Sequence, residues 1–382
     1  MLYRSLSPPN IWGIAPAIRS EARCYFTYDD FDSMKSTLVR FLLAAVLGAG
    51  VVTAASAARP SSDQYKSWLI VCDNALTCEA KGFTEGAGGT PDLRFIRGAG
   101  SAGWIGVRLS TVDSFALDDL HVDGRPLRLD PSAWKLTSSG SDGTVLSTHR
   151  IAAVEQMLTQ LRNGTVLQVG EDKDAVVPLD GLVAALLRMD DRQGRIGGVT
   201  ALVRKGATPA SMVPPPPVLP RIPERKIDAR LSGKEEQSLL KRYSAKALAQ
   251  ADGCEKEAAG HGETAAYALD VKTALVLIPC VAGAYQTSSD VYLVSRQNGV
   301  QLPLHLPAPD GKDTGNSLME PDFNPETGTL SEFDKGRGVA DCGAATAWIW
   351  DSQKFQLSSA ALQTQCGGSS PGDFPTIYRS TR

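Results

Sequence analysis

The sequence predicts an α+β protein of two domains, each a mostly antiparallel sheet with one or two helices, stapled by disulfides. Its 382 residues exceed what one hydrophobic core of ordinary size contains. Short extended runs alternate with Gly, Asp and Pro, as in hairpins, and few stretches have helical spacing. Cysteines recur in pairs along both halves. Together these features favour sheets tied by disulfides.

A proline-rich stretch at 209–223 separates the two predicted domains. It contains four consecutive prolines, Pro214 to Pro217, which cannot donate backbone hydrogen bonds and favour an extended spacer. We interpret it as a semi-rigid linker between a domain at 58–208 and a domain at 224–382. Two further segments, 1–33 and 34–57, precede the first domain.

An export signal is predicted at 34–57. Lys35 and Arg40 form its basic start, the apolar run FLLAAVLGAGVV follows, and Ala55-Ser56-Ala57 fits the cleavage site. We therefore expect translation to begin at Met34, with 1–33 a mis-assigned extension. The alternative is an uncleaved signal anchor, for which the apolar run is shorter than the roughly 20 residues of a membrane span. Cleavage would place the protein in the periplasm, with the membrane reached only through an uncleaved signal.

The cysteines predict disulfides rather than a metal site. Removal of 1–57 would remove Cys24 and leave an even number, which in an exported chain indicates disulfides. Six cysteines allow fifteen pairings. Proximity in the sequence favours three of them: Cys72–Cys78, Cys254–Cys280 and Cys342–Cys366. The first would close a hairpin that runs from Trp68 to Phe83.

The first domain is expected to contain two helices among its strands. One helix is indicated by apolar residues from Ile151 to Leu161, with Asn163-Gly164 as its stop, and another by a stripe that follows Asp180 as N-cap. The expected strands are Tyr65–Cys72, Leu93–Arg97, Trp104–Leu109, Phe115–Val122, Trp134–Leu136, Thr165–Val169 and Val199–Val203.

The second domain is expected to pack one helix against a long antiparallel meander. Its helix begins at a capping box formed by Ser232 and Glu235 and ends before Cys254. The expected strands are Ala265–Val271, Ala274–Pro279, Val291–Ser295, Gly328–Phe333, Ala344–Trp350 and Lys354–Leu357.

Two glycine motifs lack the context that their chemistry requires. Gly98 to Gly103 matches G-x-G-x-x-G, but a strand is expected to follow instead of the helix that binds a pyrophosphate. Gly368 to Gly372 matches the G-x-S-x-G nucleophile pattern without a strand-to-helix turn, and Pro371 opposes a helix there. We interpret both as loops, so no cofactor-binding residue and no catalytic residue is assigned.

No metal site is assigned either. The four histidines, His121, His149, His261 and His305, lie at no metal-ligand spacing. The acidic turn at 322–328 has oxygen ligands at alternate positions but lacks the closing glutamate of a calcium loop.

Trp348 and Trp350 are the candidate binding surface. They alternate along an expected strand, which favours packing in the core and leaves an exposed aromatic surface as the alternative. The net charge of −3 is spread without blocks, which argues against nucleic acid or an anionic membrane as partner.

Cysteine-centred motifs at both ends of the predicted mature chain resemble one family. They are Trp68-x-x-x-Cys72-Asp73-Asn74-x-x-x-Cys78-x-Ala80-x-Gly82, Pro279-Cys280-x-x-Gly283-Ala284-Tyr285, Gly336-Arg337-Gly338-x-x-Asp341-Cys342-Gly343, Trp348-x-Trp350-Asp351, Phe355-x-Leu357, Cys366-x-Gly368 and Pro375-Thr376-x-Tyr378-Arg379. The chain is similar to an exported bacterial family known as domain of unknown function 1176. Ala75-Leu76 and Ser352 depart from the pattern in turns. The family implies no activity and no functional residues.

The segment Leu161–Gly206 also resembles the invasion-associated locus B family, small exported β-rich proteins linked to host-cell entry. From all of this we expect a periplasmic, non-enzymatic protein that binds an unknown protein or envelope component, with no cofactor. Two alternatives remain open. One is a host-interaction or lysozyme-inhibitor-like protein, and the other is a periplasmic enzyme of unknown chemistry.

Overall fold

The computed structural model describes residues 58–382, except residues 87, 140–142, 251–252, 257, 259–260 and 263. The predicted extension 1–33 and the predicted signal 34–57 lie outside the described residues. The described residues fall within one compact unit, Ala54–Arg382. The boundary between two domains at 209–223 stays a prediction.

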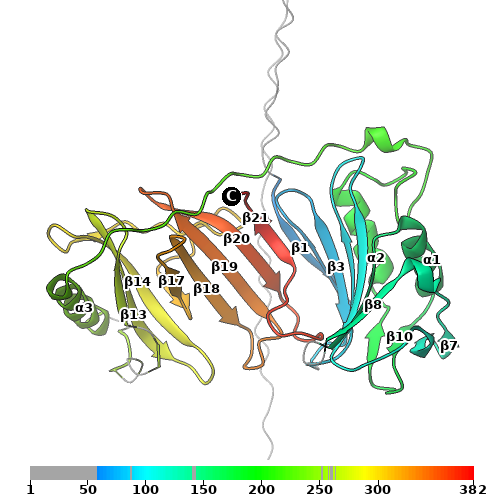
Figure 1. The fold of residues 1–382 in the computed structure, drawn as a ribbon, viewed down its shortest axis with the longest axis horizontal. Helices are drawn as coiled ribbons and strands as arrows, with labels where there is room; N and C mark the ends of the chain where they lie inside the picture. Colours follow the sequence, from blue (N-terminus) through cyan, green and yellow to red (C-terminus); the bar gives the residue numbers. More distant parts are fainter. Residues whose placement is uncertain are drawn as a thin grey trace, which may run out of the picture. The chain divides into compact units, whose positions relative to one another are not determined.

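A seven-stranded antiparallel sheet forms the N-terminal half (Figure 1). In spatial order its strands are β1 (Ser61–Tyr65), β2 (Trp68–Cys72), β3 (Cys78–Phe83), β4 (Asp92–Arg97), β5 (Ile105–Thr111), β9 (Gly143–Thr148) and β8 (Lys135–Ser139). The first five strands are consecutive hairpins, as the turn residues between them predict.

A smaller sheet and two helices cover one face of this sheet, which we call the inner face. The smaller sheet contains β11 (Val176–Pro178), β10 (Val166–Val169), β6 (Leu120–Val122) and β7 (Arg125–Pro126), and the helices are α1 (Ile151–Leu161) and α2 (Leu182–Arg192). Residues of both helices, such as Met157 and Leu186, join Phe95 and Leu109 of the large sheet in one buried cluster. The opposite face of the large sheet is the outer face.

Two five-stranded antiparallel sheets and one helix form the C-terminal half. One sheet contains β12 (Ala265–Ala268), β13 (Thr273–Ala282), β14 (Thr287–Ser295), β15 (Gln301–Leu302) and β16 (Ser317–Met319). The other contains β17 (Asp322–Asn324), β18 (Thr329–Lys335), β19 (Gly343–Trp350), β20 (Phe355–Gln363) and β21 (Thr376–Arg379). Helix α3 (Gly233–Leu248) begins at the predicted capping box and packs against β13 (Figure 1). Short 3₁₀ helices occur at Leu117–Asp119, Pro131–Ala133 and Ala210–Met212.

The predicted fold class is confirmed. The strands pair antiparallel throughout the named sheets, and three α-helices accompany them among the described residues. The three disulfides favoured by proximity are present, Cys72–Cys78, Cys254–Cys280 and Cys342–Cys366. Within the described part of the chain, no helix has the length and apolar character needed to cross a membrane.

Three local predictions are wrong. Val199–Val203 is an irregular loop instead of a strand, because the buried carboxylate of Asp190 accepts the backbone N–H groups of Leu202 and Val203 that a strand would pair. The N-cap of α2 is Gly181 instead of Asp180, whose carboxylate accepts from the Ser67 hydroxyl. The first part of the expected strand Phe115–Val122 is a 3₁₀ turn, and only Leu120–Val122 is extended.

Candidate functional site

Core packing of Trp348 and Trp350, which the sequence favours, is confirmed, and the alternative of an exposed binding surface is wrong, because both side chains are buried. Their exposed fractions are 0% and 2%, and Ile349 between them is buried as well. The Trp348 indole donates to the carbonyl of Pro307 at 2.8 Å, and Trp350 packs against Phe355. Since the last three residues of β19 are all buried, these tryptophans belong to the core.

A different tryptophan is exposed. Trp104 precedes β5, and 51% of its surface is accessible, whereas Trp68 and Trp134 are buried. Its ring contacts the His149 ring edge-on, with centroids 5.9 Å apart. A Cβ at Gly98 or at Gly106 would lie 3.0 Å from one of these rings. The two glycines therefore make room for an aromatic pair whose tryptophan is held in place and still faces solvent.

Strand register places a row of cations across the outer face of the seven-stranded sheet. Lys81 of β3 is opposite Arg94 of β4, and Arg94 is opposite Arg108 of β5. Arg108 is opposite Ser147 of β9, which is opposite Lys135 of β8. Residues directly opposite in neighbouring strands project from the same face. We call Lys81, Arg94, Arg108 and Lys135 the cation row.

The first half of the cation row is buried beneath the C-terminal segment that precedes β21. Arg94 donates to Asp92 Oδ1 at 2.8 Å and to Asp373 Oδ2 at 2.7 Å. The Lys81 ammonium donates to Gln363 Oε1 at 2.6 Å and to the carbonyl of Asp373 at 3.0 Å. These contacts join the seven-stranded sheet to residues almost 300 positions later in the chain.

Asp92 provides the central anion of this buried cluster. Its Oδ2 accepts the backbone N–H of Ser369 at 3.0 Å and the Ser369 hydroxyl at 2.6 Å. Burial opposes ionisation of Asp92, but Arg94 and Lys81 outweigh burial and lower its pKa to about 2. Burial, reinforced by the charge of Arg94, lowers the pKa of Lys81 to about 8. Each of these groups has partners within the chain, so the cluster acts as an internal joint.

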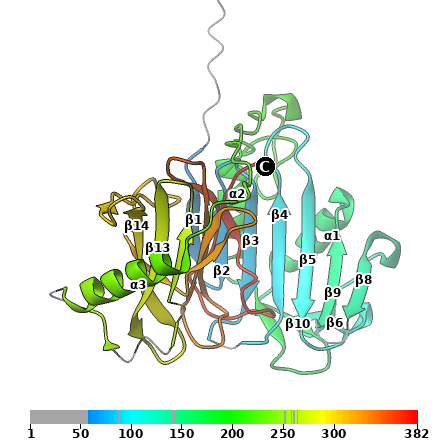
Figure 2. The same cartoon turned by 60° about the vertical axis from the view of Figure 1, so that its left-hand side comes forward.

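The second half of the cation row is open to solvent. The side chain of Arg108 is 40% exposed and lies 3.5 Å from Asp373, the anion that also binds Arg94. Lys135 is exposed on the last strand and has no ion-pair partner among the described residues. In Figure 2, β5, β9 and β8 lie side by side with no described segment drawn over their near face.

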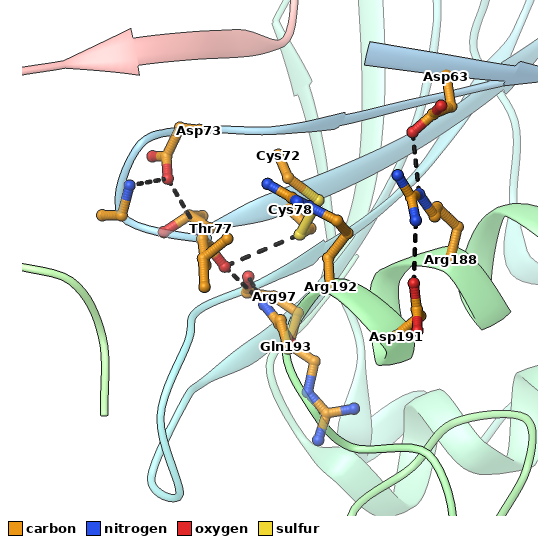
Figure 3. The surroundings of a disulfide bond; sticks show 12 residues. Asp63, Cys72, Asp73, Thr77, Cys78, Arg97, Arg188, Asp191, Arg192 and Gln193 are labelled. Carbon is orange, nitrogen blue, oxygen red and sulfur yellow. Dashed lines mark hydrogen bonds and ion pairs between the residues drawn. A yellow bond between two sulfur atoms is a disulfide. The ribbon is translucent and has the colours of Figure 1, made fainter. Parts of the chain in front are cut away.

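The Cys72–Cys78 disulfide closes a loop that binds the C-terminal strand β21. Asn74 donates its side-chain amide to the carbonyl of Arg379, and its Oδ1 accepts the backbone N–H of Arg379, both at 3.0 Å. The Arg379 guanidinium pairs with Asp73 and donates to the hydroxyl of Thr77. On its other side the loop contacts α2, because Gln193 donates to the carbonyl of Leu76 (Figure 3).

Substitution of Asn74 should loosen this attachment of β21. In Asn74→Ala the paired backbone groups of Arg379 lose their partner, and we expect a loss of about 1–3 kcal/mol in unfolding free energy. Urea titration measures it, with Asn163→Ala as a control at an exposed asparagine. Equal stability of the two variants would contradict the role of Asn74.

The glycine motifs form loops, as predicted. Residues 98–104 connect β4 to β5, and the buried guanidinium of Arg195 donates to the carbonyls of Gly98 and Gly100. Ser370, the serine of the G-x-S-x-G pattern, lies in a loop before β21, next to the Ser369 that binds Asp92.

Two groups of described side chains have the spacing of metal ligands, Cys254 with Cys280 and Asp290, and Asp341 with Cys342 and Cys366. The sulfur atoms of each group are already bonded to each other, so neither set offers free thiolates.

A cavity of about 290 Å³ opens between α1 and α2. Leu158, Leu182 and Leu186 form its apolar floor, and a Glu155–Lys205 ion pair of 2.6 Å lies at its rim. It faces away from the cation row, because both helices cover the inner face of the sheet.

Sequence analysis missed Trp104 and the cation row. The four cations occur as isolated residues in separate strands, and only the register of the sheet brings them together. A sequence signal for Trp104 existed in its glycine-rich surroundings, GAGSAGWIG, since small neighbours leave a large ring uncovered.

Comparisons with known proteins agree with the resemblance carried by the cysteine motifs. The chain is 29% identical over 345 residues to the uncharacterised protein YpfG of Escherichia coli K12, which covers 87% of this chain and 96% of that protein. No solved structure matches. The family described as "Protein of unknown function (DUF1176)" matches residues 62–381. The chain therefore belongs to the DUF1176 family.

Proposed function

We propose that this protein is an exported, non-enzymatic protein of the periplasm that acts by binding a component of the cell envelope. Three disulfides support export, because disulfides persist in oxidising compartments and are rare in the cytosol. The predicted signal at 34–57 supplies the route. The resemblance of Leu161–Gly206 to the invasion-associated locus B family stays a prediction, as does the host-interaction or inhibitor role attached to it.

The exposed Trp104 carries the proposal that the protein acts by binding. Tryptophan dominates the energetics of many interfaces, and a ring fixed before binding loses little conformational entropy when a partner covers it. Trp104 has both properties, because glycines and His149 hold a ring that is half exposed. In contrast, Lys81 and Asp92, whose pKa values are strongly shifted, bind other parts of the chain, which supports a structural role for them.

Removal of the Trp104 ring should abolish attachment to the envelope. We expect the full chain, expressed in bacteria, to be released by osmotic shock with an N-terminus near Ala58. The released protein should sediment with washed envelope fragments, and Trp104→Ala should reduce the bound fraction at least tenfold. Val271→Ala, which shortens an exposed apolar side chain in the other half, should leave it unchanged.

Two outcomes would contradict the proposal. Retention of the protein in the cytosol would contradict export, and equal sedimentation of wild type and Trp104→Ala would contradict the role of this surface. Trp104→Phe provides a further check, since it keeps an aromatic face and should retain most of the binding.

A further inference from the structure

We propose that Trp104 and the open half of the cation row bind an acidic glycan, a polysaccharide whose sugar rings carry carboxylate groups. The inference rests on the proposed function and names the chemistry of its partner. It follows from three properties of the outer face over β5, β9 and β8: its charge, its aromatic ring and its accessibility.

The charge of this face is positive. Apart from Ser139, its outward-facing residues in the three strands are Gly106, Arg108, Ser110, Gly143, Val145, Ser147, Lys135 and Thr137. Two of these are cations, and none is an acid. The acid nearest to Arg108 is Asp373, which also binds Arg94 through both of its carboxylate oxygens. Arg108 therefore keeps N–H donors for a carboxylate, and a guanidinium binds carboxylates in a bidentate geometry.

The aromatic ring adds recognition of a sugar. The face of an indole is electron-rich, and the C–H groups on one side of a pyranose ring pack against such a face. Trp104 lies two residues before Gly106, and Arg108 lies two residues after it. Two such steps amount to roughly 13 Å along a strand. A chain of several sugars that begins on Trp104 is therefore long enough to bring carboxylates to Arg108 and Lys135.

The surface between these groups suits a polymer rather than a small molecule. The side chains of Ser147 and Thr137 are small and offer hydroxyl groups to sugar oxygens. Gly106 and Ser110 are buried on this face, but Arg108, Val145, Ser147, Lys135 and Thr137 are at least partly exposed, and no described segment is drawn over the near face of β5, β9 and β8 (Figure 2). An elongated ligand can therefore lie across the three strands without displacing any described segment.

Oligogalacturonate provides the test, because its methyl ester has the same backbone without the charge. Binding to the purified protein is measured as protection of Trp104 from acrylamide quenching. The Trp104 signal is the part of the fluorescence that Trp104→Phe removes, and the described tryptophans other than Trp104 are at most 8% exposed. We expect saturable protection by oligogalacturonate and at least tenfold weaker binding of the methyl ester. Raising NaCl from 0.05 to 0.5 M should weaken binding, because salt screens exposed charges.

The double variant Arg108→Gln/Lys135→Gln should bind oligogalacturonate at least tenfold more weakly. The matched control Lys234→Gln/Lys241→Gln removes two exposed lysines from α3 and should bind as the wild type does. A second readout, sedimentation with oligogalacturonate beads, applies to Trp104→Ala, which we expect to lose at least fivefold in affinity.

Several results would overturn the inference. If the methyl ester binds as tightly as oligogalacturonate, charge has no role in binding. If polyaspartate binds as tightly as oligogalacturonate, the sugar has no role. Protection by phosphatidylglycerol vesicles and not by oligogalacturonate would assign the surface to a membrane. If Trp104-dependent sedimentation with envelope fragments persists while oligogalacturonate fails to bind, the glycan is wrong and the proposed function stands. If both fail, the proposed function is wrong as well.

Discussion

Replacement of Asp92 by alanine should lower the unfolding free energy by about 3–5 kcal/mol, because it leaves two buried cations without their central anion. Arg94 and Lys81 are 3% and 0% exposed, and Asp92 itself is fully buried. Asp92→Ala also removes the acceptor for the N–H and hydroxyl groups of Ser369. The change therefore weakens the joint between the large sheet and the C-terminal segment from both sides.

Urea unfolding of the purified protein measures this effect. Asp113→Ala, which removes an exposed carboxylate after β5, is the control and should change stability by about 0.5 kcal/mol or less. Asp92→Asn retains the size and shape of the side chain but removes its charge, and it should lower the unfolding free energy by less than Asp92→Ala does. A loss below about 1 kcal/mol in Asp92→Ala would show that the buried ion cluster contributes little.

The pH dependence of stability gives an independent check on Asp92. The pKa of Asp92 is about 2 in the folded protein, whereas the ordinary pKa of an aspartate is 3.8. A group whose pKa is lower in the folded state stabilises the protein fully when the pH is above its pKa in the unfolded state. This stabilisation is lost as the pH falls through its pKa in the folded state. The difference between wild type and Asp92→Asn should therefore be constant above about pH 4 and shrink towards pH 2.

The second large effect is expected at Trp348. Truncation of this fully buried indole in Trp348→Ala should cost about 3–5 kcal/mol, since it opens a cavity in the core and removes the hydrogen bond to Pro307. Trp104→Ala is the matched control at an exposed tryptophan, with an expected cost on the order of 0.5 kcal/mol. Thermal unfolding followed by circular dichroism measures both.

The pair of tryptophan variants separates a core role from a binding role. Trp348→Ala should be destabilised, and Trp104→Ala should lose binding while it stays folded. A stable Trp348→Ala would reject its role in the core. A strongly destabilised Trp104→Ala would show that its exposed ring contributes mainly to folding.

Much of the fold was predictable from local signals. The hairpin closed by Cys72 and Cys78, the helix at Ile151–Leu161 and the capping box at Ser232 each depend on a few neighbouring residues, and each is present. Predictions were wrong where the local structure depends on a residue far away in the sequence. The strand expected at Val199–Val203 is absent because Asp190 binds its backbone, and the sequence does not reveal that contact.

The candidate site was not predictable for the same reason. Alternation along the strand favoured the core for Trp348 and Trp350, which is correct, but it did not reveal that Ile349 between them is buried as well or that Trp104 is the exposed tryptophan. The cation row requires the β8–β9 hairpin, whose pairing places Ser147 between Arg108 and Lys135. A net charge near zero also gives no information about how charges gather on one face.

The contact between Asn74 and Arg379 has a consequence for the order of folding. These residues are 305 positions apart, and Lys81 and Arg94 likewise find their partners near the C-terminus. Such distant contacts close late, because the loop entropy between them must be lost before any contact compensates for it. A chain that is synthesised N-terminus first therefore cannot form the contacts between its large sheet and the C-terminal segment until residues 363–379 are available. Until then Lys81 lacks its acceptors on Gln363 and Asp373, and Arg94 lacks the Asp373 carboxylate.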